Sequence, residues 1–158
     1  MKFPLYLFVA ASMATPLAAF AADQHERHAV AKSNITLNAG KKWATDAPLR
    51  KAMTTLRTAV ATTLPQAHAG KATTADYDAL SKEAKAQVVY IVQNCKLDIK
   101  ADEQLHTIIA DILNGAKVAE GKQAGAERAA GVVQIAQALN TYGQYFEHAG
   151  WKIIPLPH

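Results

Sequence analysis

The hydrophobic residues from position 46 onward recur every three or four residues, a spacing typical of amphipathic helices packed on one face. We expect the first helix to begin at Asp46, an N-cap residue, with Pro48 in its first turn. We expect Pro65 and Gly70 to end it. Its apolar positions are Leu49, Met53, Leu56, Val60 and Leu64.

Two further apolar stripes predict the second and third helices. Thr73 and Thr74 are expected to cap the second, Asp98 to open the third, and Gly121 to follow the end of the third. The stripe of the second helix is Tyr77, Leu80, Ala84, Val88, Ile91 and Cys95. That of the third is Leu105, Ile108, Ile109, Ile112, Leu113 and Ala116.

The fourth helix is expected from about Lys122 to Ala149, with Gly150 stopping it. Its stripe is Val132, Ala136, Leu139, Tyr142, Phe146 and Ala149. No stretch alternates with a period of two, so we expect no sheet. Four helices joined by short connections predict an all-α fold, an antiparallel up-down-up-down four-helix bundle over residues 46–150. Residues 151–158 are expected to form a short C-terminal tail.

The N-terminal segment has a different pattern, which predicts secretion. Lys2 gives a positive start, an apolar run follows to Leu17, and small residues at Ala19 and Ala21 suit cleavage after Ala21. We therefore expect residues 1–21 to be a signal peptide, a periplasmic mature protein, and no membrane attachment after cleavage. Residues 22–45 are polar and weakly patterned, so we expect a flexible segment that becomes ordered near Trp43.

Composition and charge narrow the functional classes. The chain has 158 residues, a net charge of +4 and an alanine-rich apolar half. Alanine favours helix and predicts a narrow core. The basic residues are dispersed rather than clustered, so we expect no nucleic-acid partner. The chain contains no G-x-S-x-G, H-E-x-x-H or C-x-x-C motif, so we predict a non-enzymatic protein. The absence of C-x-x-C-H excludes covalently attached c-type haem.

The single cysteine, Cys95, is the most informative residue of the candidate chemistry. In an oxidising compartment it has no partner within the chain, so it is buried and inert, paired between two copies in a homodimer, or bound to a metal. An up-down-up-down bundle places Met53, Cys95, His106 and His148 in one half of the molecule. Thiolate, thioether and imidazole are the ligands that Cu(I) prefers. The leading prediction is therefore a Cu(I) site at one end of the bundle.

Each of these residues also has a purely structural interpretation. Methionine fills gaps in alanine-rich cores, and a lone cysteine behaves as a small apolar residue. His106 lies beside the apolar stripe, where a solvated or hydrogen-bonded side chain is expected. His148 near a helix C-terminus interacts favourably with the helix dipole. A cofactor-free interaction or stress-response module, with its protein partner unknown, is therefore an alternative function.

Two stretches resemble the periplasmic b-type cytochrome that folds as a four-helix bundle. The stretch from Leu49 to Leu56 is similar to the first helix of that family, and the resemblance implies that Met53 is an axial haem ligand. Asn140 to Gln144 is similar to the fourth helix, where a histidine follows the tyrosine. Gly143 stands at that place here. The resemblance implies a b-type haem alternative, with Met53 on one side and His106 replacing the missing histidine.

The mature chain also resembles the small secreted proteobacterial proteins labelled DnrO-like. The similar stretches run from Leu37 to Arg50, from Asn94 to Leu97 and from Ala101 to His106. This resemblance implies a helical fold and export from the cytoplasm. It implies no particular reaction.

Overall fold

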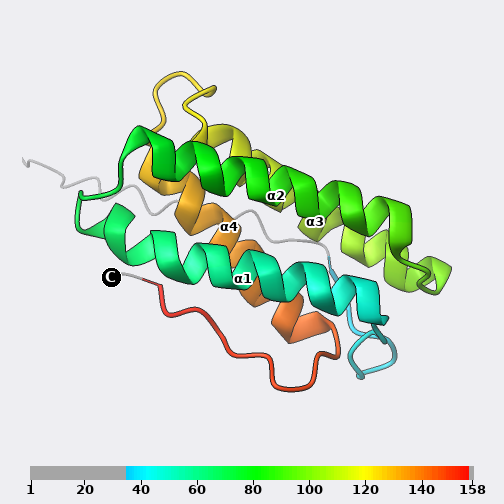
Figure 1. Cartoon of the computed structure of the whole chain (residues 1–158). Coiled ribbons are helices and arrows are strands. Elements are labelled where there is room, and N and C mark those ends of the chain that lie inside the picture. Colours follow the sequence, from blue (N-terminus) through cyan, green and yellow to red (C-terminus); the bar gives the residue numbers. More distant parts are fainter. Residues whose placement is uncertain (1–34, 157–158) are drawn as a thin grey trace, which may run out of the picture. The chain divides into compact units, whose positions relative to one another are not determined.

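The computed structural model describes residues 35–156 and shows four helices (Figure 1). Helix α1 spans Ala47–His68, α2 Thr74–Asn94, α3 Ile99–Ala119 and α4 Arg128–Tyr145. Only two isolated β-bridges, and no strand, occur within this part of the chain. The prediction of an all-α fold with four helices is confirmed. The predicted signal peptide, residues 1–21, lies outside the described residues.

The first three helices begin where their capping residues predict. Asp46 Oδ1 accepts a hydrogen bond of 2.8 Å from the Leu49 amide. Thr73 and Asp76 form a reciprocal capping box, and Asp98 Oδ1 accepts from the Lys100 amide at 3.0 Å. These side chains satisfy amides that have no partner within the first turn of a helix.

Pro65 does not end α1, which was the expected role of this residue. The helix continues for three more residues to His68. Proline removes only one hydrogen bond of the final turns, and that part of the helix stays packed because Leu64 and Ala67 are buried. The chain leaves the helix at Gly70, whose φ of +65° suits glycine.

Helix α4 is shorter than predicted at both ends. Gly121 and Gly125 adopt φ values of +72° and +74°, so a loop occupies the residues before Arg128. At the other end Phe146 is extended, with φ −115° and ψ 140°. There the chain pairs with Trp43 instead, whose amide donates to the Tyr145 carbonyl at 2.8 Å. Ala149, predicted in the stripe of this helix, is exposed.

The described part of the predicted flexible segment packs against the helices. Ile35 and Trp43 are buried. The Trp43 indole donates to the Thr36 carbonyl at 2.6 Å, and the Thr36 amide donates to Gln104 Oε1 at 2.8 Å. Residues 35–45 therefore contain buried side chains and tertiary hydrogen bonds near Trp43, while residues 22–34 lie outside the description. Helical periodicity gave no signal here because the segment is held by tertiary hydrogen bonds.

Hydrogen bonds gather the helix ends into two clusters. At one end, Asp46 Oδ2 accepts from the Lys96 amide at 2.7 Å, so the start of α1 meets the residues after α2. The end of α4 joins them through Trp43. At the other end, Arg128 donates to the Thr74 carbonyl, to Asp78 and to the Glu120 carbonyl. This arginine therefore connects the start of α4 to the start of α2 and the end of α3.

Helices α3 and α4 make the most extensive contact of the bundle and approach each other at two glycines. A Cβ atom on Gly131 would lie 2.4 Å from the Ala119 nitrogen and 2.5 Å from the Gly115 oxygen. A Cβ on Gly115 would lie 2.8 Å from Cγ1 of Ile135. The two backbones therefore touch without intervening side chains, which agrees with the narrow core predicted from the alanine content.

The predicted C-terminal tail is held along the bundle over residues 151–156, which we call the strap (Figure 1). The Asn140 side chain of α4 makes two hydrogen bonds with the backbone of Ile154, of 2.8 and 2.9 Å. Arg57 of α1 donates to the Lys152 carbonyl at 2.6 Å. Ile154 is buried, so the strap adds an apolar residue to the core.

Within residues 35–156, no helix combines the length and the apolar character that crossing a membrane requires.

Gly131→Ala tests the close approach of α3 and α4. In an exposed helix this change stabilises a protein by about 0.5–1 kcal/mol. Here the new methyl group meets backbone atoms that cannot rotate away, so we expect the free energy of unfolding to fall by about 1–3 kcal/mol. Urea denaturation measures the change. Asn114→Ala, at an exposed position of α3, is the control and should leave stability within about 0.5 kcal/mol. A stabilising Gly131→Ala would contradict the close contact.

Candidate functional site

The candidate site lies where the start of α1, the end of α2 and the end of α4 meet. Asp46 is central to it, because its two carboxylate oxygens accept from the amides of Leu49 and Lys96. One side chain thus caps α1 and fixes the chain that leaves α2. Cys95 is the residue between α2 and Lys96, so its position depends on this bond.

Cys95 is half-buried at the C-cap position of α2, and its backbone amide donates to the Ile91 carbonyl at 2.9 Å. Burial raises the pKa of its thiol to about 12, and the neighbouring Asp46 carboxylate contributes to the rise. The thiol is therefore protonated at neutral pH. Because the thiolate is the form that binds metals and reacts, this environment makes the cysteine a weak ligand and a weak nucleophile.

Met53 and His106 occupy different environments. The Met53 side chain is fully buried in the core of the bundle. The His106 side chain is 69% exposed on α3. Its Nδ1 atom lies 2.8 Å from the Asp102 carbonyl, one turn earlier in the same helix. The contacts of His106 are thus with its own helix and with solvent, and they do not bring it to Met53.

His148 lies just after α4 and turns back onto that helix. Its Nδ1 atom is 3.0 Å from the Tyr142 hydroxyl, and its Nε2 atom is 3.4 Å from Thr54 Oγ1 of α1. Burial lowers the pKa of this imidazole, and the charge of Arg50 lowers it further. The ring is therefore held in its neutral form with both nitrogens near hydroxyl groups. Sequence reasoning placed His148 on the helix, but α4 ends at Tyr145.

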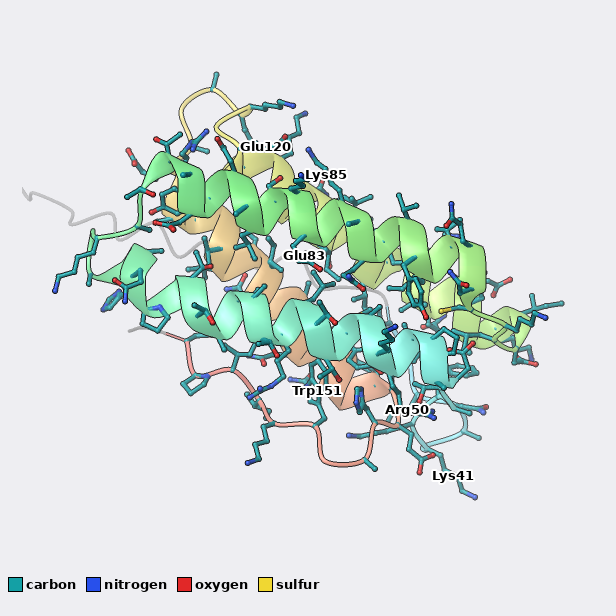
Figure 2. All side chains as sticks on the ribbon, in the orientation of Figure 1. Lys41, Arg50, Glu83, Lys85, Glu120 and Trp151 are labelled. Atoms are coloured by element: carbon teal, nitrogen blue, oxygen red, sulfur yellow. The ribbon has the colours of Figure 1, made fainter. Side chains whose placement is uncertain are left out.

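Trp151 packs against the same two residues, Tyr142 and His148. Its ring centroid lies 4.9 Å from those of both Tyr142 and His148. A Cβ atom on Gly143 would lie 2.3 Å from two indole atoms, so the tryptophan rests directly on this glycine. Figure 2 shows Trp151 reaching from the strap towards the helices. The indole therefore fills the space beside Gly143.

A second charged cluster lies at the opposite end of the bundle. Lys85 of α2 forms an ion pair with Glu120, and Lys122 lies 3.0 Å from the other carboxylate oxygen (Figure 2). Hydrogen bonds from these two lysines lower the pKa of Glu120 to about 2. The carboxylate is therefore ionised and already paired, which suits a structural link between α2 and the end of α3.

His148 contacts Thr54, the neighbour of Met53, and Cys95 lies beside Asp46, while His106 faces solvent. No group of three His, Cys, Asp or Glu side chains suited to a metal ion occurs within residues 35–156. A Cys–Met–His site would use only two such residues, so the copper prediction remains a prediction.

Sequence reasoning missed the partners that engage these residues: Asp46 at Cys95, and Tyr142, Thr54 and Trp151 around His148. Tyr142 was assigned only to the apolar stripe, yet its hydroxyl makes the bond to His148. The available signal was Gly143, a small residue in the last turn with an aromatic residue eight positions later. Such a glycine is consistent with a ring packed against a helix backbone.

No protein-family model, curated protein or solved structure matches this chain. The inferences below therefore depend on the geometry of the described residues.

The lowered pKa of His148 predicts a dependence of stability on pH. Its folded-state pKa lies below the ordinary value of 6.5, so the unfolded chain binds more protons between the two values. The contribution of neutral His148 to the free energy of unfolding is fully present above pH 6.5. It is lost as the pH falls through the folded-state pKa of this histidine. We expect His148→Gln to lose less stability than the wild type between pH 7 and pH 5, as measured by urea denaturation. Parallel curves for the wild type and His148→Gln would contradict the assignment.

The raised pKa of Cys95 predicts slow chemistry at its thiol. At pH 8 we expect native protein to react with iodoacetamide at least about 100-fold more slowly than urea-unfolded protein, because little thiolate is present. Asp46→Asn keeps an N-cap residue but removes the negative charge, so it should accelerate the reaction. Asp98→Asn is the matched control and should leave the rate unchanged. Equal rates for native and unfolded protein would show that the thiol is neither buried nor influenced by Asp46.

Proposed function

We propose that this protein is a non-enzymatic, periplasmic interaction module that works without a cofactor. In this proposal residues 1–21 are a cleaved signal peptide, and the helices form an antiparallel up-down-up-down bundle. The observation that carries the proposal is the state of three of the four predicted ligands. The Cys95 thiol is protonated, the Met53 side chain is buried, and both His148 nitrogens lie near hydroxyl groups, while His106 is exposed.

His148 provides the strongest support. Both of its nitrogens lie near hydroxyl groups, on Tyr142 and on Thr54, and Trp151 packs against its ring. A metal ion at either nitrogen would have to displace one of these partners. Tyr142 is fully buried, and loss of a partner leaves a buried hydroxyl unsatisfied at a cost of about 1–3 kcal/mol.

The two cofactor hypotheses make different demands on the same residues. Copper binding by Cys95, Met53 and His106 requires the Cys95 thiol to lose its proton beside the Asp46 carboxylate. Haem binding by Met53 and His106 requires room in the bundle, and Trp151 occupies the space at Gly143. Both hypotheses need a rearrangement that the cofactor-free interpretation avoids.

Competition for Cu(I) against a chromophoric chelator tests the proposal. We expect wild-type protein, Cys95→Ser and Met53→Leu to leave the same amount of copper on the chelator. Met53→Leu conserves volume, so it removes the thioether without opening the core. Copper retained by the wild type and lost in Cys95→Ser would overturn the cofactor-free proposal and support the copper site.

Haem titration of the same proteins provides the second measurement. We expect no shift of the Soret band on adding haem, because the indole of Trp151 fills the site. A Soret shift that disappears in Met53→Leu and in His106→Gln would support the b-type haem alternative instead. Elemental analysis for copper and visible absorbance for haem, both on protein purified from the periplasm, check the two results without added ligand.

A further inference from the structure

An open groove with a volume of about 590 Å³ lies between α1 and α2. Its α1 side consists mainly of threonines, at positions 54, 55, 58, 62 and 63. Its α2 side includes the carboxylates of Asp76 and Glu83. Figure 2 shows Glu83 at the seam between the two helices. The groove is separate from the cluster of His148 and Trp151, apart from Thr54, which borders both.

Four of the five threonine hydroxyls that line the groove have donated their protons to carbonyls within α1. Thr58 Oγ1 donates to the Thr54 carbonyl at 3.0 Å, and Thr62 Oγ1 donates to the Thr58 carbonyl at 3.1 Å. Thr55 and Thr63 make the same bond to the residue four positions earlier. A hydroxyl that has donated its proton retains only lone pairs. This wall of the groove therefore favours a ligand that donates hydrogen bonds.

The opposite wall carries two negative charges at a regular distance. Asp76 and Glu83 are seven residues apart, which corresponds to two helical turns and about 10 Å along α2. Hydrogen bonds with Thr73 lower the pKa of Asp76, so this carboxylate is ionised at neutral pH. Glu83 Oε1 accepts from Gln87 at 2.7 Å, which leaves its other oxygen available. No lysine or arginine occurs among the described residues that line the groove.

Apolar groups lie between the two charges. Leu80 and Ala79 follow Asp76 on α2, and Ala59 faces them from α1. The threonine methyl groups add to this surface. A ligand that fits these walls has cationic, donating groups at a separation of about two helical turns and methylene groups between them.

We propose that the groove binds a linear aliphatic polyamine. One ammonium group pairs with Asp76 and another with Glu83, and both donate to threonine oxygens while the methylene chain lies on the alanine and leucine surface. This inference rests on the proposed function, since it names the ligand class that a cofactor-free module would bind. The protein carries a net charge of +4, so attraction for a cation comes from these local carboxylates and not from the whole molecule.

Calorimetric titration with spermidine at low salt tests the proposal. We expect a dissociation constant on the order of 1 mM or tighter. Glu83→Gln should weaken binding about two- to fivefold, the range for a partly exposed ion pair. Thr58→Val removes one acceptor at constant shape and should weaken binding about twofold. Raising the ionic strength to 1 M should also weaken binding, because salt screens exposed charges.

Matched controls separate a groove from general charge attraction. Glu103→Gln and Thr107→Val make the same chemical changes on α3, outside the groove, and should leave the affinity unchanged. A neutral diol with the same chain length should bind much more weakly than spermidine. Equal effects of Glu83→Gln and Glu103→Gln, equal binding of the diol, or no binding of spermidine would each overturn the proposal. Those outcomes do not affect the copper and haem titrations, so the two proposals fail independently.

Discussion

The backbones of α3 and α4 touch at Gly115 and Gly131, and the narrow form of the bundle depends on this contact. Two helices that approach without side chains between them leave little space for large residues, so alanine fills much of the core. The buried Ser81 hydroxyl of α2 donates to the Ala116 carbonyl of α3 at 3.0 Å. A core of this kind is dense but thin.

Because the core is thin, the polar groups of interest lie at the ends of the helices and on the surface. At one end, Asp46 joins two helices through backbone amides, and the aromatic corner of Tyr142, His148 and Trp151 closes the space beside them. The groove between α1 and α2 remains open, with its acceptors facing solvent. Closed polar clusters stabilise a structure, whereas open ones retain the capacity to bind. The contrast between these regions supports a module that acts through its surface.

The helices could be predicted from the sequence because their signals are local. Asp46, Thr73 and Asp98 each cap a helix through bonds within a few residues, and the apolar stripes follow the helical period. The end of α4 could not be predicted, because Phe146 leaves the helix to pair with Trp43, more than one hundred residues away. In the candidate site, too, local features could be predicted from the sequence and long-range contacts could not. Sequence reasoning grouped Cys95 with His148 at one end, but the state of each depends on tertiary partners, Asp46 and Tyr142 respectively. Periodicity carries no information about such partners.

The strap is attached in a way that separates its stability from that of the helices. Asn140 holds Ile154 through a side-chain amide, so the backbone ladder of α4 takes no part in the attachment. The hydrogen bonds from Asn140 and Arg57 to the strap are made by side chains, so its release would leave every helical hydrogen bond in place. The strap packs along the face that α1 and α4 form, where Arg57 and Asn140 bind its backbone. Its departure would open beside Gly143 the space that the Trp151 indole now fills.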